Sequence, residues 1–426
     1  MPEGGTGGRP RGRKRARTAI FVTVLLDLLG FGMILPILPF YGQQYGASDL
    51  QVGVLFASFS AAQLVFAPLL GRLSDRLGRR PVLLVTIAAS AGAHLVFAFA
   101  GSFTVLVAAR TASGAAAANF GIAQAYMADV SPAGERAKAM GLVGAAFGLG
   151  FVLGPAFGGL LSLVDRVAVP LGAAGLGLVN LALASAWLPE SLSAELRAAS
   201  RAAPWLDPRR AAAVVRDGTL LGLMLLLFTV TFCMSMMEAT VALLVQARFG
   251  WGDAETAWLF VFVGVVMVAA QGGLIGVAVA RFGEARVIPA GIAAIAAGLG
   301  LLAIAVSAPL LYLAAALLAL GAGLNAPATL GLLSRQVGEE RQGGTLGVAR
   351  SFGALARVLG PLAGTWLFGQ VSPAAPYWAG ASVLAVAFGL AGLVLRRVPA
   401  AGPAAEAADA AESAEGIGSV GTAPPL

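Results

Sequence analysis

Long apolar stretches separated by short polar segments dominate the chain. Each stretch is close to the length of about 20 residues that an α-helix needs to cross the hydrocarbon core of a bilayer. Twelve such runs occur, at approximately 19–40, 50–70, 81–100, 103–128, 138–162, 167–188, 219–245, 255–279, 287–306, 309–333, 344–368 and 377–395. A segment in lipid must satisfy its own backbone hydrogen bonds, so runs of this length predict helices. The pattern therefore predicts an all-α membrane protein with twelve transmembrane helices.

The two halves of the chain repeat each other. The first-half residues that recur 204 to 206 positions later include Gly46, Gly71, Arg76, Gly78, Asn119, Gly154 and Pro155. A nearly constant offset over half a chain indicates a duplicated six-helix unit. Each unit has an even number of spans, so both begin on the same side of the membrane, as parallel repeats do. We expect two pseudo-symmetric six-helix bundles. They are not equal in function, because Ala280 replaces Asp75 and Glu284 replaces Arg79.

The polar segments divide the chain into two bundles, a linker and two tails. We place the N-terminal bundle at 19–188 and the C-terminal bundle at 219–397. Residues 189–218 mix arginines with carboxylates, which predicts a cytoplasmic linker of partly interfacial character. Residues 1–18 form a basic N-terminus and residues 398–426 an Ala-, Gly-, Pro- and Glu-rich tail, and both compositions predict disorder.

Composition and charge support the membrane location and give it an orientation. The chain is 58% hydrophobic and 12% charged, with a formal net charge of +7 and one cysteine, which excludes a disulfide framework. Aromatic residues do not alternate with the basic ones, so nucleic acid is not an expected partner. Segments assigned to the inside hold 23 of the 28 Lys and Arg, and those outside hold only Arg166 and Arg248. The distribution predicts a cell inner-membrane protein with both termini in the cytoplasm.

The segment between the second and third spans carries the most specific motif. It reads Gly-Arg-Leu-Ser-Asp-Arg-Leu-Gly-Arg-Arg and matches G-x-x-x-D-R-x-G-R-R at Gly71, Asp75, Arg76, Gly78, Arg79 and Arg80. Spacing and position resemble the loop between helices two and three of the major facilitator superfamily. The resemblance implies that Asp129, at the end of the fourth span, joins Asp75 and Arg79 in a cytoplasmic charge cluster that locks one conformation.

Glycines recur along one face of the fifth span. Gly150, Gly154 and Gly158 are four residues apart and give a flat face that another helix can approach closely. Pro155 removes one backbone hydrogen bond and permits a bend. Such faces are also ordinary packing in membranes. Together with Gly159, however, the segment resembles the G-P-x-x-G-G element of the proton-driven antiporters of the superfamily, which implies export.

Further segments narrow the resemblance to one branch. The chain from 24 to about 186 resembles the twelve-span drug:proton antiporters, in particular the tetracycline-efflux branch. The segments that carry this resemblance are Leu25-Leu26-Asp27, Phe66-Ala67-Pro68 and Gly148-Leu149-Gly150. Tetracycline exporters carry acids in the third and ninth spans and a histidine in the eighth, where this chain has Ala93, Ile295 and Met267. The resemblance therefore implies the transport cycle rather than efflux of a magnesium–tetracycline chelate.

Few ionisable residues lie inside the spans. Placing one such side chain at the centre of a membrane helix costs about 2.5–3.5 kcal/mol on insertion scales, so each needs an explanation. Asp27 is either a proton-binding or cation-attracting carboxylate or a helix-end acid paired with an arginine. Glu238 is either a coupling or substrate group or a structural, permanently protonated acid. Arg110, with Gly114 four residues later, resembles the R-x-x-x-G element of the superfamily. The resemblance implies that Arg110 is a cation that favours proton release from a nearby acid. The alternative is that it is a purely structural counter-ion. The resemblance places His94, the only histidine, at the periphery of the fold, where it is satisfied or flanked by lipid; the alternative is a proton relay.

Polar and polarizable side chains in the spans are candidates for lining a pocket between the halves. They are Gln63, Asn119, Gln124, Phe232, Met236, Gln271, Asn325 and Arg357. Methionine adapts to varied apolar ligands. The alternative is that these side chains only fill space or face lipid.

Together these features predict a proton-coupled antiporter that exports small amphipathic compounds, such as drugs or antibiotics, by alternating access. The alternative is a proton-coupled transporter of one metabolite. A membrane enzyme would need clustered His, Asp or Ser groups, and a single histidine excludes most metal sites. A receptor or scaffold would not need charged groups inside the bilayer. We expect protons as the coupling ion, no cofactor or metal, a small-molecule substrate, the lipid bilayer as surroundings, and a monomer.

Overall fold

The computed structural model describes residues 10–132, 135–195, 197–198, 216–337 and 339–396. Residues 1–9, the tail 398–426 and the centre of the predicted linker, residues 199–215, lie outside this part of the chain, and so do the predictions made for them. Within it, all the regular structure is helical.

The first half forms helices that correspond to the first six predicted spans. They are α1 (Pro10–Ile34), α2 (Leu38–Gln44), α3 (Asp49–Leu77), α4 (Arg79–Ala98), α5 (Phe103–Ala117), α6 (Phe120–Asp129), α7 (Arg136–Ser162) and α8 (Ala168–Trp187). Short α2 follows α1 after a turn at residues 35–37, where Pro36 cannot continue a helical ladder. The fourth span is divided into α5 and α6 at Ala118 and Asn119.

The second half repeats the arrangement. Its helices are α11 (Gly218–Phe249), α12 (Asp253–Ala269), η2 (Ala270–Leu274), α13 (Ile275–Phe282), α14 (Glu284–Ala303), α15 (Ala308–Arg335), α16 (Glu339–Gln370) and α17 (Ala375–Arg396). Eleven helical spans in the described ranges are long and apolar enough to cross a membrane. The predicted span 344–368 lies in α16, which is 32 residues long and carries Arg350 and Arg357. Twelve transmembrane helices in two six-helix bundles are therefore present.

Positive backbone dihedrals confirm the duplication. Gly46 and Gly250, which are 204 residues apart, have φ of 70° and 66°. Gly78 and Gly283, 205 residues apart, have φ of 113° and 74°. Each of the latter two ends one helix and precedes the first residue of the next. Because side chains other than hydrogen disfavour these dihedrals, glycine at equivalent places marks the same turn in both copies.

The start of α1 differs from the sequence-based prediction. Residues 10–18 were predicted to be disordered, yet α1 begins at Pro10. Proline is accepted at the start of a helix, and the following Ala and Arg residues are good helix formers. An ion pair between Arg17 Nη1 and Glu135 Oε2, 2.5 Å long, ties the beginning of α1 to the residue before α7.

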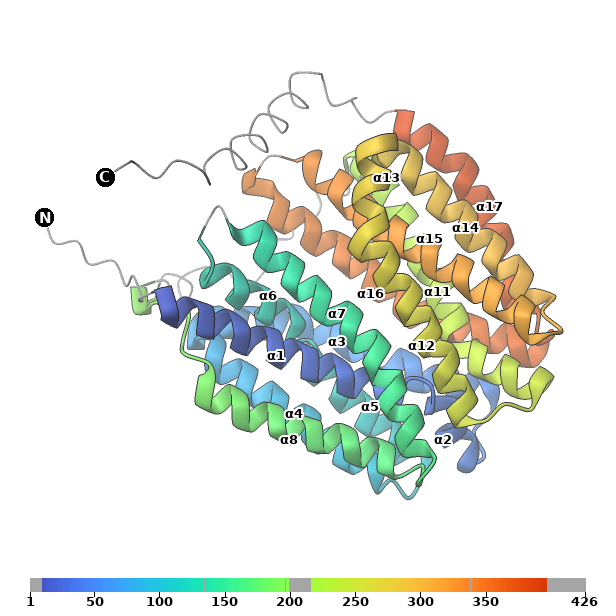
Figure 1. Ribbon diagram of the computed structural model, residues 1–426, viewed down its shortest axis with the longest axis horizontal. Coiled ribbons are helices and arrows are strands. Elements are labelled where there is room, and N and C mark those ends of the chain that lie inside the picture. Colours follow the sequence, from blue (N-terminus) through green and yellow to red (C-terminus); the bar gives the residue numbers. More distant parts are fainter. Residues whose placement is uncertain (1–9, 133–134, 196, 199–215, 338, 397–426) are drawn as a thin grey trace, which may run out of the picture.

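The bundles lie side by side, the N-terminal one blue to green and the C-terminal one yellow to red (Figure 1). Across the boundary, α3 packs against α16 and α7 packs against α12. One apolar core belongs to the C-terminal bundle, while another joins both bundles through residues such as Leu38, Leu55 and Leu243. The bundles are thus in contact mainly through these four helices and through one shared core.

Candidate functional site

A cavity of about 2130 Å³ lies between the bundles and is lined by both of them. Its lining includes Arg72 near the end of α3, Asp217 before α11, and Gln336 after α15. We call this end of the molecule, where Arg79 and Arg335 also lie, the basic end. The cavity extends to the basic end.

The opposite end is sealed by contacts between the bundles, and we call it the sealed end. Arg166 Nε lies 2.7 Å from Asp253 Oδ2 at the start of α12. Gln43 Nε2 donates to Gln246 Oε1 over 3.0 Å across the boundary, while Tyr41 donates its hydroxyl proton to the Arg166 carbonyl within the N-terminal bundle. Sequence reasoning did not identify this seal. The available signal was Arg166 itself, one of two cations among the segments assigned to the outside.

Asp27 faces the cavity from α1. Its Oδ2 accepts a hydrogen bond of 2.9 Å from Asn119 Nδ2. The division between α5 and α6 falls at Asn119, which places the buried amide opposite α1. Asp27 takes part in no ion pair among the described residues, so pairing with an arginine, the structural alternative, is not what holds its side chain here.

Arg110 is almost fully buried and also reaches the cavity. Its guanidinium carbon lies 4.5 Å from the centroid of the Phe59 ring, and Nε donates to the Leu55 carbonyl over 3.5 Å. Gly114 permits this stacking, because a Cβ there would lie 2.1 Å from the Phe59 carbonyl oxygen. The R-x-x-x-G element thus places a cation against the aromatic face of α3.

His94 does not lie at the periphery of the fold. It is buried, lines the cavity and packs its ring carbon near Gly30 of α1. Its Nδ1 has no hydrogen-bond partner. The prediction failed because α4 turns this face toward α1 and the cavity rather than toward lipid.

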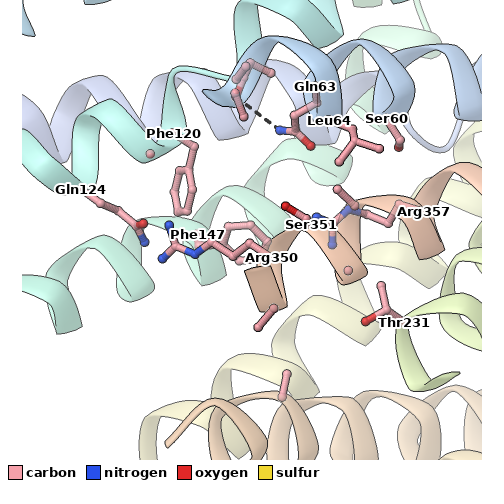
Figure 2. A pocket seen from close by; sticks show the side chains of 18 of the residues that line it. Ser60, Gln63, Leu64, Phe120, Gln124, Phe147, Thr231, Arg350, Ser351 and Arg357 are labelled. Atoms are coloured by element: carbon pink, nitrogen blue, oxygen red, sulfur yellow. Dashed lines mark hydrogen bonds between the residues drawn. The ribbon is translucent and has the colours of Figure 1, made fainter. Parts of the chain in front are cut away.

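Glu238 of α11 and two arginines of α16 face the cavity from the C-terminal bundle. Glu238 interacts electrostatically with Arg357, without an ion pair within 4.0 Å among the described residues. Figure 2 shows Arg357 and Arg350 extending from α16 into the cavity, Arg350 on the side of Gln124 and Phe147. Because the acid and the arginine come from different helices, only the fold brings them together.

Four of the five predicted amides line the cavity, Asn119 among them. Gln63 donates to the Ala117 carbonyl over 3.3 Å, while Gln124 Oε1 has no partner. Gln271 lies in the π-helical segment η2, which interrupts the eighth span. These positions follow the sequence-based expectation. No group of three His, Cys, Asp or Glu suited to a metal ion occurs in the part of the chain that the structure describes.

Phe232, Met236 and Asn325 do not line the cavity, although the sequence suggested that they would. Asn325 is buried and donates to the Ile288 carbonyl of α14. Met236 packs against Gly364 and Gly380, and Phe232 stacks on Phe228. The side chains belong to the faces of α11 and α15 that pack within the C-terminal bundle.

The predicted charge cluster forms at the basic end. Arg79 pairs with Asp75 and lies 3.4 Å from Asp129 Oδ2. Glu190 accepts from the backbone N–H groups of Arg79 and Arg80 at the start of α4. All these residues belong to the N-terminal half, and a Cβ at Gly71 would meet no neighbouring atom.

The C-terminal bundle carries a related pair with the charges reversed. Arg335 Nη2 lies 3.4 Å from Glu284 Oε1. These residues stand 206 and 205 positions after Asp129 and Arg79. The second copy of the motif therefore keeps a charge pair at this place, with the acid and the base exchanged.

The glycine face of α7 packs against α1. Cβ atoms at Gly150, Gly154 and Gly158 would come within 3.0 Å of atoms of Leu28, Gly32 and Met33 respectively. Gly159 faces Ala257 of α12, across the boundary between the bundles. Pro155 lies inside α7 without ending it. The fifth span thus contacts both its own bundle and the other one closely.

Two six-helix bundles around a cavity that reaches one end, with ionisable side chains facing it, define a membrane transporter. The sequence profile of the Major Facilitator Superfamily matches residues 20–276 and 246–426. The chain belongs to the Major Facilitator Superfamily.

Named relatives agree with the branch that the motifs indicated. The class C tetracycline resistance protein of Escherichia coli is 34% identical over 357 residues, which cover 83% of this chain and 89% of the relative. The Major facilitator superfamily domain-containing protein 10 of Bos taurus is 32% identical, with 83% and 88% covered. The crystal structure of the human organic anion transporter MFSD10 (TETRAN) has a TM-score of 0.71 and 28% identity, covering 90% of this chain and 100% of that one. The resemblance to the tetracycline-efflux branch is confirmed.

Proposed function

We propose that the protein is a proton-coupled antiporter that exports small amphipathic compounds by alternating access. The observation that carries the proposal is the cavity between the bundles, which reaches the basic end and presents Asp27 and Glu238 to its interior. The excess of arginine and lysine at this end supports a cytoplasmic location for it. In this orientation the cavity accepts substrate from inside the cell, and tetracycline resistance among the relatives supports transport outward.

Alternation would consist of a rocking of one bundle against the other around the cavity. The contacts of the sealed end, including the pair of Arg166 and Asp253, separate in one half of the cycle. The cluster of Asp75, Arg79 and Asp129 then lies where the basic end closes. The close glycine contacts of α7 with α1 keep the N-terminal bundle rigid during this motion.

Proton exchange would use Asp27 and Glu238, with Arg110 as a fixed cation that faces the same cavity. An ionisable group inside a membrane protein marks a substrate or proton pathway when it faces a cavity rather than lipid. Asp27 has a neutral partner, Asn119, whereas Glu238 lies in the field of Arg357. The two acids thus have different environments in different bundles, and each can be loaded from the open side and discharged after the bundles rock.

Gradient-driven transport in proteoliposomes tests the proposal. With the purified full chain, an imposed pH gradient should drive accumulation of a fluorescent amphipathic substrate against its concentration gradient. Asp27→Asn and Glu238→Gln should each abolish this accumulation, whereas exposed Asp165→Asn should not. Undiminished gradient-driven transport in both cavity variants would refute the coupling assignment. If the unchanged protein transports the substrate equally well with and without the pH gradient, antiport is refuted.

The names of the relatives leave the substrate class open. Some are tetracycline resistance proteins, and one solved structure is that of an organic anion transporter. A growth-inhibition panel in an efflux-deficient host would show which compounds this chain exports and whether it accepts many or only one metabolite.

A further inference from the structure

Helix α16 presents two arginines to the cavity without a carboxylate bound to either. Arg350 and Arg357 are seven residues apart, about two helical turns, and so share one face. Both side chains are exposed to the cavity interior. Neither takes part in an ion pair or hydrogen bond in the described part of the chain, and the charged group that acts on Arg357 is Glu238. Unbound guanidinium groups inside a membrane protein indicate water or an anionic ligand opposite them.

The other charges of the cavity do not compensate Arg350. The lining carries four arginines and three acidic residues, which are Arg72, Arg110, Arg350, Arg357, Asp27, Asp217 and Glu238. Arg72 and Asp217 belong to the basic end, and Arg110 is stacked on Phe59. Asp27 is on α1, in the other bundle, where Asn119 holds it. The α16 wall therefore has an excess of positive charge.

A row of aromatic rings lines the opposite wall. Phe59, Phe31, Phe151, Phe147 and Phe120 follow one another with centroid separations of 5.0, 6.2, 4.8 and 6.1 Å. All five line the cavity and belong to the N-terminal bundle. Figure 2 shows Phe147 and Phe120 on the side toward which Arg350 extends. An apolar wall thus faces a cationic wall across the same space.

We propose that α16 forms an anion subsite and that the preferred substrates are aromatic or otherwise apolar organic acids. Arg350 and Arg357 hold the carboxylate or sulfonate, because a guanidinium donates two parallel hydrogen bonds to such a group. The hydroxyl groups of Thr231 and Ser351 line the same part of the cavity. The apolar body lies against the row of phenylalanines.

The subsite rests on the proposed function only for the direction of transport. Outward movement of a monovalent organic anion in exchange for one proton carries two positive charges inward. A membrane potential that is negative inside therefore adds to the pH gradient in driving export. Binding itself is an equilibrium property of this conformation and needs no gradient.

Calorimetric titration of the purified full chain in an uncharged maltoside detergent tests the subsite. The probes are 1-naphthoate, neutral 1-naphthamide and cationic 1-naphthylmethylamine, which share one aromatic body. We expect 1-naphthoate to bind about tenfold more tightly than 1-naphthamide, since one hydrogen bond to a charged group is worth that factor. Equal affinity of acid and amide, preference for the amine, or no binding of the acid would overturn the proposal. This comparison needs no variant.

Variants then locate the subsite. Arg350→Gln and Arg357→Gln should each weaken 1-naphthoate binding about tenfold and leave 1-naphthamide binding unchanged. Arg281→Gln is the matched control, because Arg281 lies on α13 outside the cavity lining. Arg350→Lys keeps the charge and should retain part of the affinity. Acid preference that survives both glutamine variants would overturn the assignment to α16.

The two proposals fail in distinguishable ways. If acid-selective binding is found but no pH gradient drives transport, the antiport proposal fails and the subsite stands. If a gradient drives transport of neutral or cationic compounds while 1-naphthoate neither binds nor competes, the subsite fails and antiport stands.

Discussion

At the scale of single residues, the partners of Asp27 and Glu238 decide what each can do. Asp27 accepts a hydrogen bond from Asn119, a neutral donor that remains a donor whether or not the acid carries a proton. Glu238 lies near Arg357, whose positive charge does not change in the physiological range. The N-terminal acid is therefore oriented by a neutral group, and the C-terminal acid lies beside a fixed charge that an anionic substrate would share.

Asp27→Asn should abolish gradient-driven accumulation and preserve exchange of substrate between the two sides. The amide has nearly the same shape and still accepts from Asn119, but it cannot carry a proton. Counterflow of labelled substrate without a pH gradient measures the preserved step. Loss of counterflow together with accumulation would show that Asp27 supports the fold or substrate binding rather than proton coupling.

Arg110→Lys should reduce gradient-driven transport about tenfold, although the charge is kept. Lysine lacks the flat guanidinium that stacks on Phe59 and the Nε–H that donates to the Leu55 carbonyl. A hydrogen bond from a charged group contributes about 1.5–3 kcal/mol, which corresponds to at least such a factor. Initial rates of uptake at matched protein content measure the effect. A fully active lysine variant would mean that only the charge of Arg110 matters.

At the scale of the helix, α7 depends on glycine at some positions and not at others. Its face toward α1 is so close that a Cβ at Gly154 would lie 2.8 Å from the Cα of Gly32. A Cβ at Gly144, on the same helix, would meet no atom within 4 Å. Close backbone approach is what small residues provide in membranes, where packing drives helix association.

Gly154→Ala should therefore destabilise the protein and Gly144→Ala should not. Overpacking of a close contact costs about 1–3 kcal/mol. Thermal unfolding in detergent should show a melting temperature several degrees lower for Gly154→Ala, with no significant change for Gly144→Ala. Equal melting temperatures for the two variants would contradict the packing of α7 against α1 seen here.

The repeat shows how far sequence could predict this site. Asn119 and Asn325 occupy equivalent positions, and the same reasoning placed both in the pocket. In the structure, the Asn119 side chain donates a hydrogen bond to Asp27, whereas the Asn325 side chain donates to a backbone carbonyl of α14. Apolar periodicity predicts that a helix exists, and motif spacing identifies its special residues. The rotation of a helix relative to a cavity depends on packing against several partners at once, which no local pattern contains.

At the scale of the whole molecule, the described conformation depends on contacts at both ends. Among the described residues at the basic end, the pairs of Arg79 with Asp75 and Asp129 and of Arg335 with Glu284 each lie within one bundle. The sealed end holds Arg166 of one half against Asp253 of the other. The difference explains why the cavity reaches one end and not the other, and it identifies the contact that alternation must break.

Breaking the Arg166–Asp253 pair should shift the protein toward opening of the sealed end. The side chains are 37% and 12% exposed, so the pair is worth up to about 1 kcal/mol, or roughly a fivefold change in the ratio of the two conformations. Spin labels at Val164→Cys and Val371→Cys, both exposed and one in each half, report the separation, and native Cys233 is buried. Asp253→Asn should add a population at longer distance. The exchanged variant, Arg166→Asp with Asp253→Arg, should remove it again, because the attraction is restored with reversed polarity. An unchanged distance distribution in Asp253→Asn would show that the shared apolar core alone holds this end closed.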